Sequence, residues 1–296
     1  MNERRQLEAE DTAFALKNTP LRPRERRALL EAPGTFHVGS DDGEVFLADV
    51  EGQQALFWSF RDVESMRQQF PDMWQEAREH IRRDEVDHVT TDVSGLPTRE
   101  WLEPLLRDAD FEFFAEWMEM SNPDLDADAV PEFPDSLTMR KATEDDLERM
   151  YEIWSAAYGD YGDGPASFDW LTEQAGWAGA LEDEDGELIA FAFNSPVERA
   201  EGRVLAAAVA PEAWGNGYGR LILAAAVYQL AASDAVRATI RVRPDIKPAL
   251  RTCADLGFKY ARAGLEYRRP VDEEAIAQKW EERRVAGVKA RFGKWR

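Results

Sequence analysis

The chain has 296 residues, 44% of them hydrophobic, which is enough for two domains with packed cores. Its formal net charge is −22, from 58 acidic and 36 basic residues, and this acidity excludes general affinity for nucleic acids or anionic membranes. The single cysteine excludes an internal disulfide bond.

No apolar run reaches the length that spans a bilayer, and the charged start lacks the apolar segment of a secretory signal. A lone cysteine also suits a reducing compartment, so we expect a soluble cytoplasmic protein. The three histidines, His37, His80 and His88, are too few and too scattered to predict a metal site.

Residues 1–34 predict helices that Pro20 and Pro23 interrupt. Short runs between turn signals then predict strands, and apolar residues at helical spacing predict two helices, the second starting at Pro71. The expected ranges up to residue 120 are strands 35–38, 44–50, 55–60, 87–93 and 111–120, and helices 63–70, 71–81 and 98–107.

An acidic segment with three prolines, residues 121–135, predicts a linker. Beyond it, Thr143 can cap a helix, with Asp146 at the reciprocal capping position. The expected ranges are strands 137–141, 177–181, 188–194, 203–209 and 236–242, and helices 143–154, 221–232, 247–258 and 272–286.

Residues 209–220 join a strand of small apolar residues to an apolar helix through a turn that contains Gly215, Gly217 and Gly219. Outward-pointing amides and the positive end of the helix dipole favour an anion such as phosphate at this turn, and glycine allows a close approach. The spacing differs from the dinucleotide-binding G-x-G-x-x-G, and no P-loop Gly-Lys-Ser/Thr follows. A helix entry with glycines by chance is the remaining interpretation.

The whole frame, Val209-x-Pro-Glu-x-x-Gly-x-Gly-x-Gly, resembles the loop that binds the acyl-CoA pyrophosphate in the GNAT N-acetyltransferases. The family has Arg or Gln where this chain has Trp214. The resemblance extends over about residues 137–270, including a helix that closes on Gly257-Phe258. It implies acetyl-CoA as the co-substrate, bound by Ala208, Val209, Trp214, Gly215, Asn216, Gly217, Tyr218, Gly219 and Arg220.

The strand, helix and strand before residue 120 repeat the order between Val236 and Arg269. The resemblance therefore implies an α/β (α+β) protein with two GNAT-like domains, each a mixed twisted sheet flanked by helices. We expect residues 1–130 to form the first domain and residues 131–296 to form the acyl-CoA-binding domain with a C-terminal helix. Where the phosphate loop would lie, the first domain has Phe60–Arg67, which contains two carboxylates and no glycine. We expect this copy to be degenerate.

The resemblance implies direct transfer of the acetyl group to a primary amine, between splayed parallel strands at Leu205–Val209 and Thr239–Val242. An amide near Val209 would polarise the thioester carbonyl. Because an alkyl ammonium has a pKa of about 10, a base must remove a proton before attack. The candidate bases are Glu198, and Asp160 and Asp163 in the loop that begins at Tyr158.

In the family, a Tyr four residues before the Gly-Phe pair often protonates the leaving thiolate, and Cys253 stands at that position here. A thiol can donate a proton, although a lone helical cysteine is usually a small buried residue. If Cys253 only packs in this way, water, Tyr158 or Tyr161 would protonate the leaving thiolate. The Asn found seven residues earlier in the family is replaced by Ile246.

Two functions therefore remain open. One is an active acetyl-CoA-dependent N-acyltransferase that acts on a small-molecule amine or a peptide amine. The other is a catalytically impaired acyl-CoA-binding or regulatory module, which the departures at Cys253 and Ile246 would allow. No metal, nucleic acid or membrane is expected as a partner, and a homodimer is left open. The tandem layout is similar to that of mycothiol synthases, a likeness of fold that leaves the amine undefined.

Overall fold

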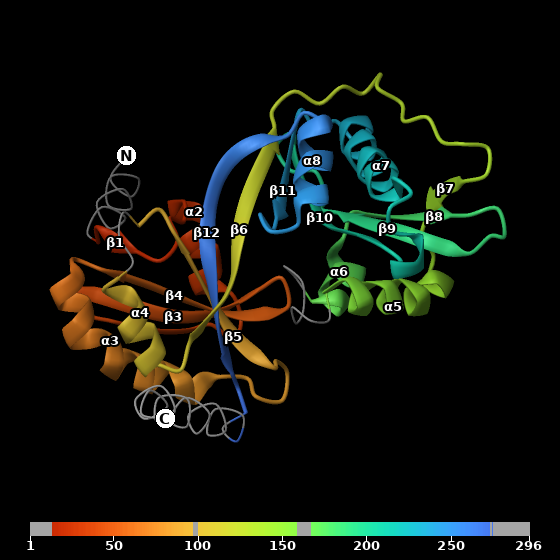
Figure 1. The fold of residues 1–296 in the computed structure, drawn as a ribbon. Helices are drawn as coiled ribbons and strands as arrows, with labels where there is room; N and C mark the ends of the chain where they lie inside the picture. Colours follow the sequence, from red (N-terminus) through yellow and green to blue (C-terminus); the bar gives the residue numbers. More distant parts are fainter. Residues whose placement is uncertain (1–13, 97–99, 159–166, 273, 275–296) are drawn as a thin grey trace, which may run out of the picture. The chain divides into compact units, whose positions relative to one another are not determined.

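The computed structural model describes residues 14–96, 100–158, 167–272 and 274, and its chain divides into two compact units (Figure 1). The first unit takes in the described residues up to Phe114 and those from Leu265 onward, and the second comprises Ala115–Gly264. Most of the helix expected at residues 272–286 and the loop at 159–166 lie outside the described residues. No helix within the described ranges is long and apolar enough to cross a membrane.

The first unit contains a mixed sheet whose strands follow the order β2-β3-β4-β5. The pairs β2–β3 and β3–β4 are antiparallel, β4 and β5 are parallel, and β1 pairs with the end of β4. Its elements are β1 (Leu16–Lys17), α2 (Pro23–Glu31), β2 (Phe36–Gly39), β3 (Gly43–Val50), β4 (Gln53–Phe60), α3 (Val63–Ala77), a 3₁₀ turn (Arg78–His80), β5 (His88–Ser94), α4 (Leu102–Asp108) and the start of β6 (Glu112–Asn122).

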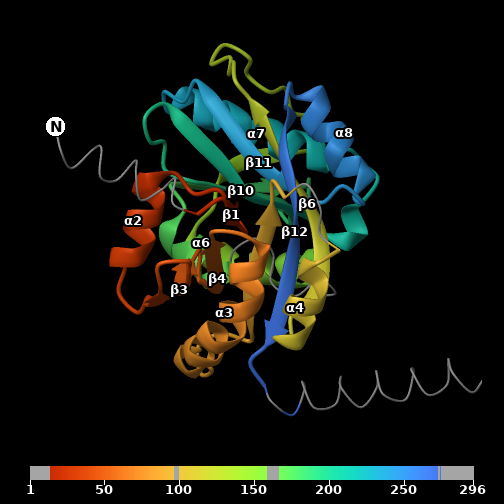
Figure 2. The same cartoon turned by 90° about the vertical axis from the view of Figure 1, so that its left-hand side faces the viewer.

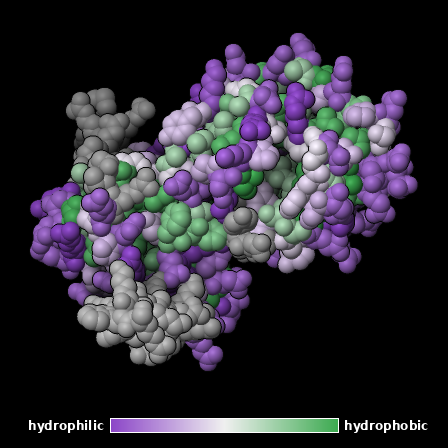
Figure 3. Space-filling view, viewed as in Figure 1, coloured by the Kyte–Doolittle hydropathy of each residue, from purple (hydrophilic) through white to green (hydrophobic). Residues whose placement is uncertain are grey.

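Helices cover both faces of this sheet, because its strands bury side chains on both sides (Figure 2). Leu29 and Leu30 of α2 pack against Phe46 and Phe57 on one face. The larger core lies on the other face, where α3 and α4 pack against β3 and β4. Hydrophilic side chains dominate the molecular face in Figure 3, as the net charge of −22 requires.

The helix α3 runs from Val63 to Ala77 as one element, so the expectation of two helices with a break at Pro71 is wrong. The buried stripe of Met66, Phe70, Met73, Trp74 and Ala77 continues on both sides of the proline. This continuous packing stabilises the helix across the missing proline N–H.

The second unit contains a sheet with the order β6-β11-β10-β9-β8-β7, in which only β10 and β11 are parallel among the described pairs. The helices α5 and α6 lie on one face, and α7 and α8 on the other (Figure 1). Its elements are β7 (Thr138–Lys141), a 3₁₀ turn (Glu144–Asp146), α5 (Leu147–Tyr158), α6 (Phe168–Gln174), β8 (Trp177–Glu182), β9 (Leu188–Asn194), β10 (Glu201–Val209), η4 (Pro211–Ala213), α7 (Tyr218–Ala232), β11 (Arg237–Val242), α8 (Lys247–Asp255) and β12 (Lys259–Pro270).

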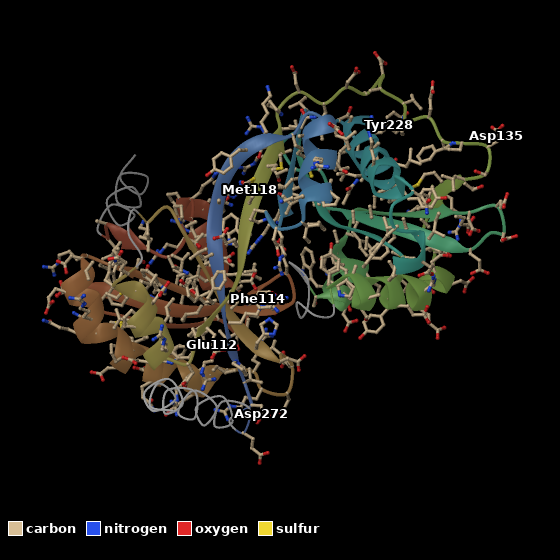
Figure 4. All side chains as sticks on the ribbon, viewed as in Figure 1. Glu112, Phe114, Met118, Asp135, Tyr228 and Asp272 are labelled. Atoms are coloured by element: carbon tan, nitrogen blue, oxygen red, sulfur yellow. The ribbon has the colours of Figure 1, made fainter. Side chains whose placement is uncertain are left out.

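The long strands β6 and β12 carry the chain from one unit to the other. Figure 4 labels Glu112, Phe114 and Met118 along β6, of which the first two belong to the first unit. This division differs from the expected boundary at residues 130 and 131. The acidic segment 121–135 lies inside the second unit, where the Leu125 amide donates to the Val236 carbonyl at 3.1 Å. The prolines and acidic residues of this segment indicate an exposed stretch of chain. The boundary between the two units instead lies within the strands β6 and β12.

The succession β4-α3-β5-α4-β6 in the first unit recurs as β10-α7-β11-α8-β12. In both halves the first two strands of the succession are parallel and are joined by a helix. The expected pair of related mixed sheets flanked by helices is therefore present, and α3 corresponds to α7.

A buried carboxylate on β3 connects the first sheet to helix α2. Glu44 is 4% exposed and accepts hydrogen bonds from Arg26 Nε at 3.0 Å and from Ser59 Oγ at 2.8 Å, and its other oxygen lies 3.1 Å from His37 Nε2. Burial raises the pKa of Glu44, but the bonds from His37, Arg26 and Ser59 outweigh burial and lower it to about 2. The carboxylate is therefore ionised in the folded state.

Glu44→Gln should reduce the free energy of unfolding by about 3 kcal/mol at pH 7, because it removes a buried charge and leaves Arg26 unbalanced. The pKa of Glu44 rises from about 2 to 4.5 on unfolding, so its contribution is complete above pH 4.5 and is lost as the pH falls toward 2. Urea unfolding at pH 7, 4 and 3 measures this, with the exposed Asp41→Asn as control. A difference between wild type and Glu44→Gln that does not change with pH would contradict the assignment.

Candidate functional site

The parallel strands β10 and β11 part halfway along β10. Their pairing runs from Glu201 to Val204 on β10, and Val204 is opposite Ile240. Beyond that point β10 stays paired with β9 as far as Val209, and β11 stays paired with β6 as far as Val242. Within the described residues, Leu205–Val209 therefore has an open edge inside the sheet, as the resemblance implied. On β11 the expected range is too long, because Thr239 and Ile240 still pair with Arg203 and Val204.

A β-bulge accounts for the divergence. The pairing of β10 with β9 shifts register between Val204 and Ala206, which marks Leu205 as the extra residue. A bulge bends its strand and increases the local twist, and this turns β10 away from β11. The Ala210 amide donates to the Ile189 carbonyl on β9 at 2.8 Å. Because backbone groups alternate in direction along a strand, the N–H groups of Ala207 and Val209 face the open edge.

The turn into α7 leaves the start of that helix accessible. Gly215 and Gly217 have φ of +85° and +84°, a conformation that favours glycine, and a Cβ on either would meet no atom within 4 Å. Gly217 is the N-cap, so no side chain covers the first helical amides. The amides of Tyr218 and Gly219 have no acceptor within an α-helix. The result is an open cradle for an anion at a helix N-terminus.

The corresponding turn of the first unit is closed by its own carboxylate. Asp62 is the N-cap of α3, and its Oδ1 accepts from the Ser65 amide at 2.8 Å. This bond lowers the pKa of Asp62, so the helix start already carries a negative charge. The missing glycine was predicted from the sequence, whereas the cap was not, although Asp before a helical run is a strong N-cap signal.

The helix α7 is attached to the sheet beneath the open edge. Asn194 on β9 is 1% exposed, and its Nδ2 donates to the Ala226 carbonyl at 2.8 Å. Ile222, Ala226 and Leu230 are buried on the same helix. This packing keeps the N-terminus of α7 beside the end of β10.

Tyr158, the last residue of α5, reaches the open edge. Its hydroxyl donates to the Ala207 carbonyl at 3.2 Å, and its ring centroid lies 4.3 Å from that of Trp154. Burial raises the pKa of Tyr158 to about 12, while the bond to Ala207 opposes this rise. The phenol therefore keeps its proton at neutral pH next to the strand that lines the gap.

Trp214 also contacts this edge, which the sequence reading did not foresee. Its Nε1 donates to the Val209 carbonyl at 2.7 Å, while 60% of the residue is exposed. One indication of this contact was visible in the sequence, because Trp214 stands where the family has Arg or Gln. The two outward carbonyls of β10 at Ala207 and Val209 are thus both occupied by aromatic donors.

The structure does not bring Cys253 or Glu198 to this edge. Cys253 is 1% exposed within the apolar core, and burial raises the pKa of its thiol to about 11. Glu198 lies in the exposed turn before β10, where its amide donates to the Glu201 carbonyl at 2.9 Å. At a rise of about 3.3 Å per residue, that end of β10 is about 20 Å from Ala207. Asp160 and Asp163 lie outside the described residues.

Across residues 14–96, 100–158 and 167–272, no group of three or more His, Cys, Asp or Glu side chains could hold a metal ion. The polar groups described at the open edge are backbone amides, two carbonyls that accept hydrogen bonds, and the aromatic donors Tyr158 and Trp214. The donors among these groups bind anions and carbonyl oxygens rather than cations.

An open strand edge next to an uncapped glycine turn defines a site for an extended ligand with an anionic group, the arrangement expected of an acyltransferase. Residues 140–258 match the model of the acetyltransferase (GNAT) family. This part of the chain belongs to the GNAT family.

Two curated relatives are mycothiol acetyltransferases. The one from Gordonia bronchialis is 31% identical over 125 residues, covering 36% of this chain and 41% of the relative. The one from Tsukamurella paurometabola is 28% identical over 178 residues, covering 51% and 58%. The chain thus spans about half the length of these relatives. Among solved structures, a tandem GNAT protein from the clavulanic acid biosynthesis pathway superposes with a TM-score of 0.56 at 14% identity, covering 92% of this chain and 96% of that one. At this identity the likeness concerns the fold.

Gly217→Ala should lower the free energy of unfolding by about 1 kcal/mol, because alanine disfavours a positive φ. Gly219→Ala is the matched control two residues along, since its Cβ would lie 3.7 Å from Val209 Cγ2 in ordinary contact. That change should be neutral or stabilise the helix by up to about 1 kcal/mol. Urea unfolding of both variants measures the difference, and equal losses would contradict the conformational role of Gly217.

Proposed function

We propose that the second unit is an acetyl-CoA-dependent N-acetyltransferase that transfers the acetyl group to a primary amine by direct attack on the thioester. The observation that carries this proposal is the open edge of β10 leading directly into the uncapped N-terminus of α7. Acetyl-CoA has the matching chemistry, since an amide-containing arm connects its pyrophosphate to the thioester.

The pyrophosphate would bind at the turn from Gly215 to Gly219. The open space beside Gly215 and Gly217 allows the phosphates to approach the backbone, and the helix dipole favours their charge. The arm would extend along Leu205–Val209 and add to the sheet edge as another strand. Acetyl-CoA supplies the activated acyl group, and the N–H groups of Ala207 and Val209 would stabilise the thioester oxygen as charge develops.

Tyr158 would stabilise the departing sulfur. Its hydroxyl donates to the Ala207 carbonyl, 3.2 Å away, and its pKa of about 12 keeps the phenol protonated. As the thioester breaks, this single O–H would turn from the Ala207 carbonyl to the sulfur. Cys253 would only pack, because its thiol is sealed in the core. The base that deprotonates the ammonium would not be Glu198, which lies at the far end of β10.

Turnover is favoured over the alternative of an impaired acyl-CoA-binding module. The two relatives are both named as acetyltransferases, and Tyr158 of α5 brings a phenol to the open edge of β10. The first unit would not bind acetyl-CoA, because Asp62 occupies the amides where a phosphate would lie. The acceptor would be a small-molecule or peptide amine.

Gly219→Glu should weaken acetyl-CoA binding by about tenfold or more relative to Gly219→Gln, because its carboxylate would lie beside the pyrophosphate. The glutamine variant has nearly the same size without the charge. An acidic residue in the first turn stabilises a helix, so loss of binding could not be explained by unfolding. Calorimetric titration measures both dissociation constants, and equal affinities would remove the cofactor assignment.

Tyr158→Phe should lower kcat by about 10²-fold with little change in the dissociation constant of acetyl-CoA, because it removes a donor used in the transition state. Cys253→Ala should keep kcat within about threefold and reduce stability by about 1 kcal/mol. Steady-state kinetics on an amine panel, following release of free CoA, compares the two. A large loss of rate in Cys253→Ala, with Tyr158→Phe unaffected, would reverse the two roles.

A further inference from the structure

The indole of Trp214 occupies a hydrogen-bonding position that belongs to the open edge of β10. Its Nε1 lies 2.7 Å from the Val209 carbonyl oxygen, the separation at which the N–H of a paired chain would stand. The Ala210 amide bonds to β9, so the Val209 carbonyl points to the opposite side, toward the gap. The side chain thus takes the place of a partner strand at the mouth of the gap.

A carbonyl at a strand edge needs a donor, and an incoming extended chain provides one. A chain that pairs with β10 as far as Val209 brings its own N–H to this oxygen. A carbonyl oxygen can accept two hydrogen bonds. Here both donors would approach the Val209 oxygen from the gap side, so we expect one of them to displace the other.

We propose that Trp214 is a positioning residue that controls how far the donor's arm pairs along β10. Its indole N–H satisfies the Val209 carbonyl in the free protein and is replaced by an amide N–H of the arm when acetyl-CoA binds. The inference rests on the proposed function, because it requires an amide-containing arm that lies along Leu205–Val209.

Burial decides which of the two aromatic donors moves. Trp214 is 60% exposed, so turning its ring into water sacrifices little packing. Tyr158 is packed against Trp154, with ring centroids 4.3 Å apart, and stays on the Ala207 carbonyl. Binding thus exchanges the bond at Val209 and preserves the one at Ala207.

Trp214→Phe tests the exchange, because it keeps an aromatic ring, although a smaller one, and removes the competing N–H. In the variant, water replaces the indole at the exposed carbonyl, so acetyl-CoA should bind about fivefold more tightly than to wild type. ADP, which carries a pyrophosphate without the arm, should bind both proteins equally. Calorimetric titration of the full chain gives the four dissociation constants, and thermal unfolding checks that the variant is folded.

A second measurement follows the indole itself. The chain has 10 tryptophans, and the indole N–H signal that disappears in Trp214→Phe identifies Trp214 in a proton–nitrogen spectrum. On saturation with acetyl-CoA, this proton should lose its hydrogen-bonded shift and exchange faster with water, whereas ADP should leave it unchanged.

Unchanged or weaker binding of acetyl-CoA to Trp214→Phe would overturn the exchange, as would an indole signal that stays protected in the complex. Parallel losses for acetyl-CoA and ADP would show that the ring contacts the nucleotide instead. If wild type binds no acetyl-CoA, the proposed function fails and this inference falls with it. If wild type binds acetyl-CoA and Trp214→Phe binds it equally well, the exchange at Val209 is wrong while the proposed function stands.

Discussion

The separation of β10 from β11 after the Val204–Ile240 pair is the constraint on which the site depends. Each strand stays bonded to its outer neighbour, so the gap opens without unravelling the sheet. The bulge at Leu205 provides the bend, and the exposed backbone groups of Leu205–Val209 are the consequence. An unpaired strand edge inside a sheet is normally a liability, and here Tyr158 and Trp214 cover its two outward carbonyls.

The two halves of the chain share one order of elements, but the helices α3 and α7 differ in the charge of the residue at their N-cap. In both, a strand leads into a helix that returns to a parallel strand. Asp62 caps α3 with a carboxylate, whereas Gly217 leaves the amides of α7 open. A helix N-terminus binds an anion only when its own sequence does not already supply one. The proposed difference in phosphate binding between the halves therefore rests on a few residues, while the order of elements is shared.

The proposed proton donor lies on a different element from the tyrosine of the family. The helix position that carries a tyrosine in the family holds Cys253 here, and that side chain is buried in the core. Tyr158 approaches β10 from α5, on the opposite face of the sheet from α8 (Figure 1). A donor that approaches from another element can serve the same atoms, since catalysis depends on where the hydroxyl lies.

The sequence by itself determined most of the elements, the glycine turn and the family, because these depend on residues close together in the chain. It missed the strand β1 and the helix α6. Gly217 needs its positive φ, and the apolar run after Tyr218 makes a helix, whatever lies elsewhere. Only the tertiary structure decided that the two units divide within the strands β6 and β12, that Pro71 lies inside one helix, and that Glu198 is far from Ala207. It also decided that Tyr158 and Trp214 meet the outward carbonyls of β10. Those outcomes depend on strand register and on contacts between segments distant in sequence, where one bulged residue changes which groups face the gap.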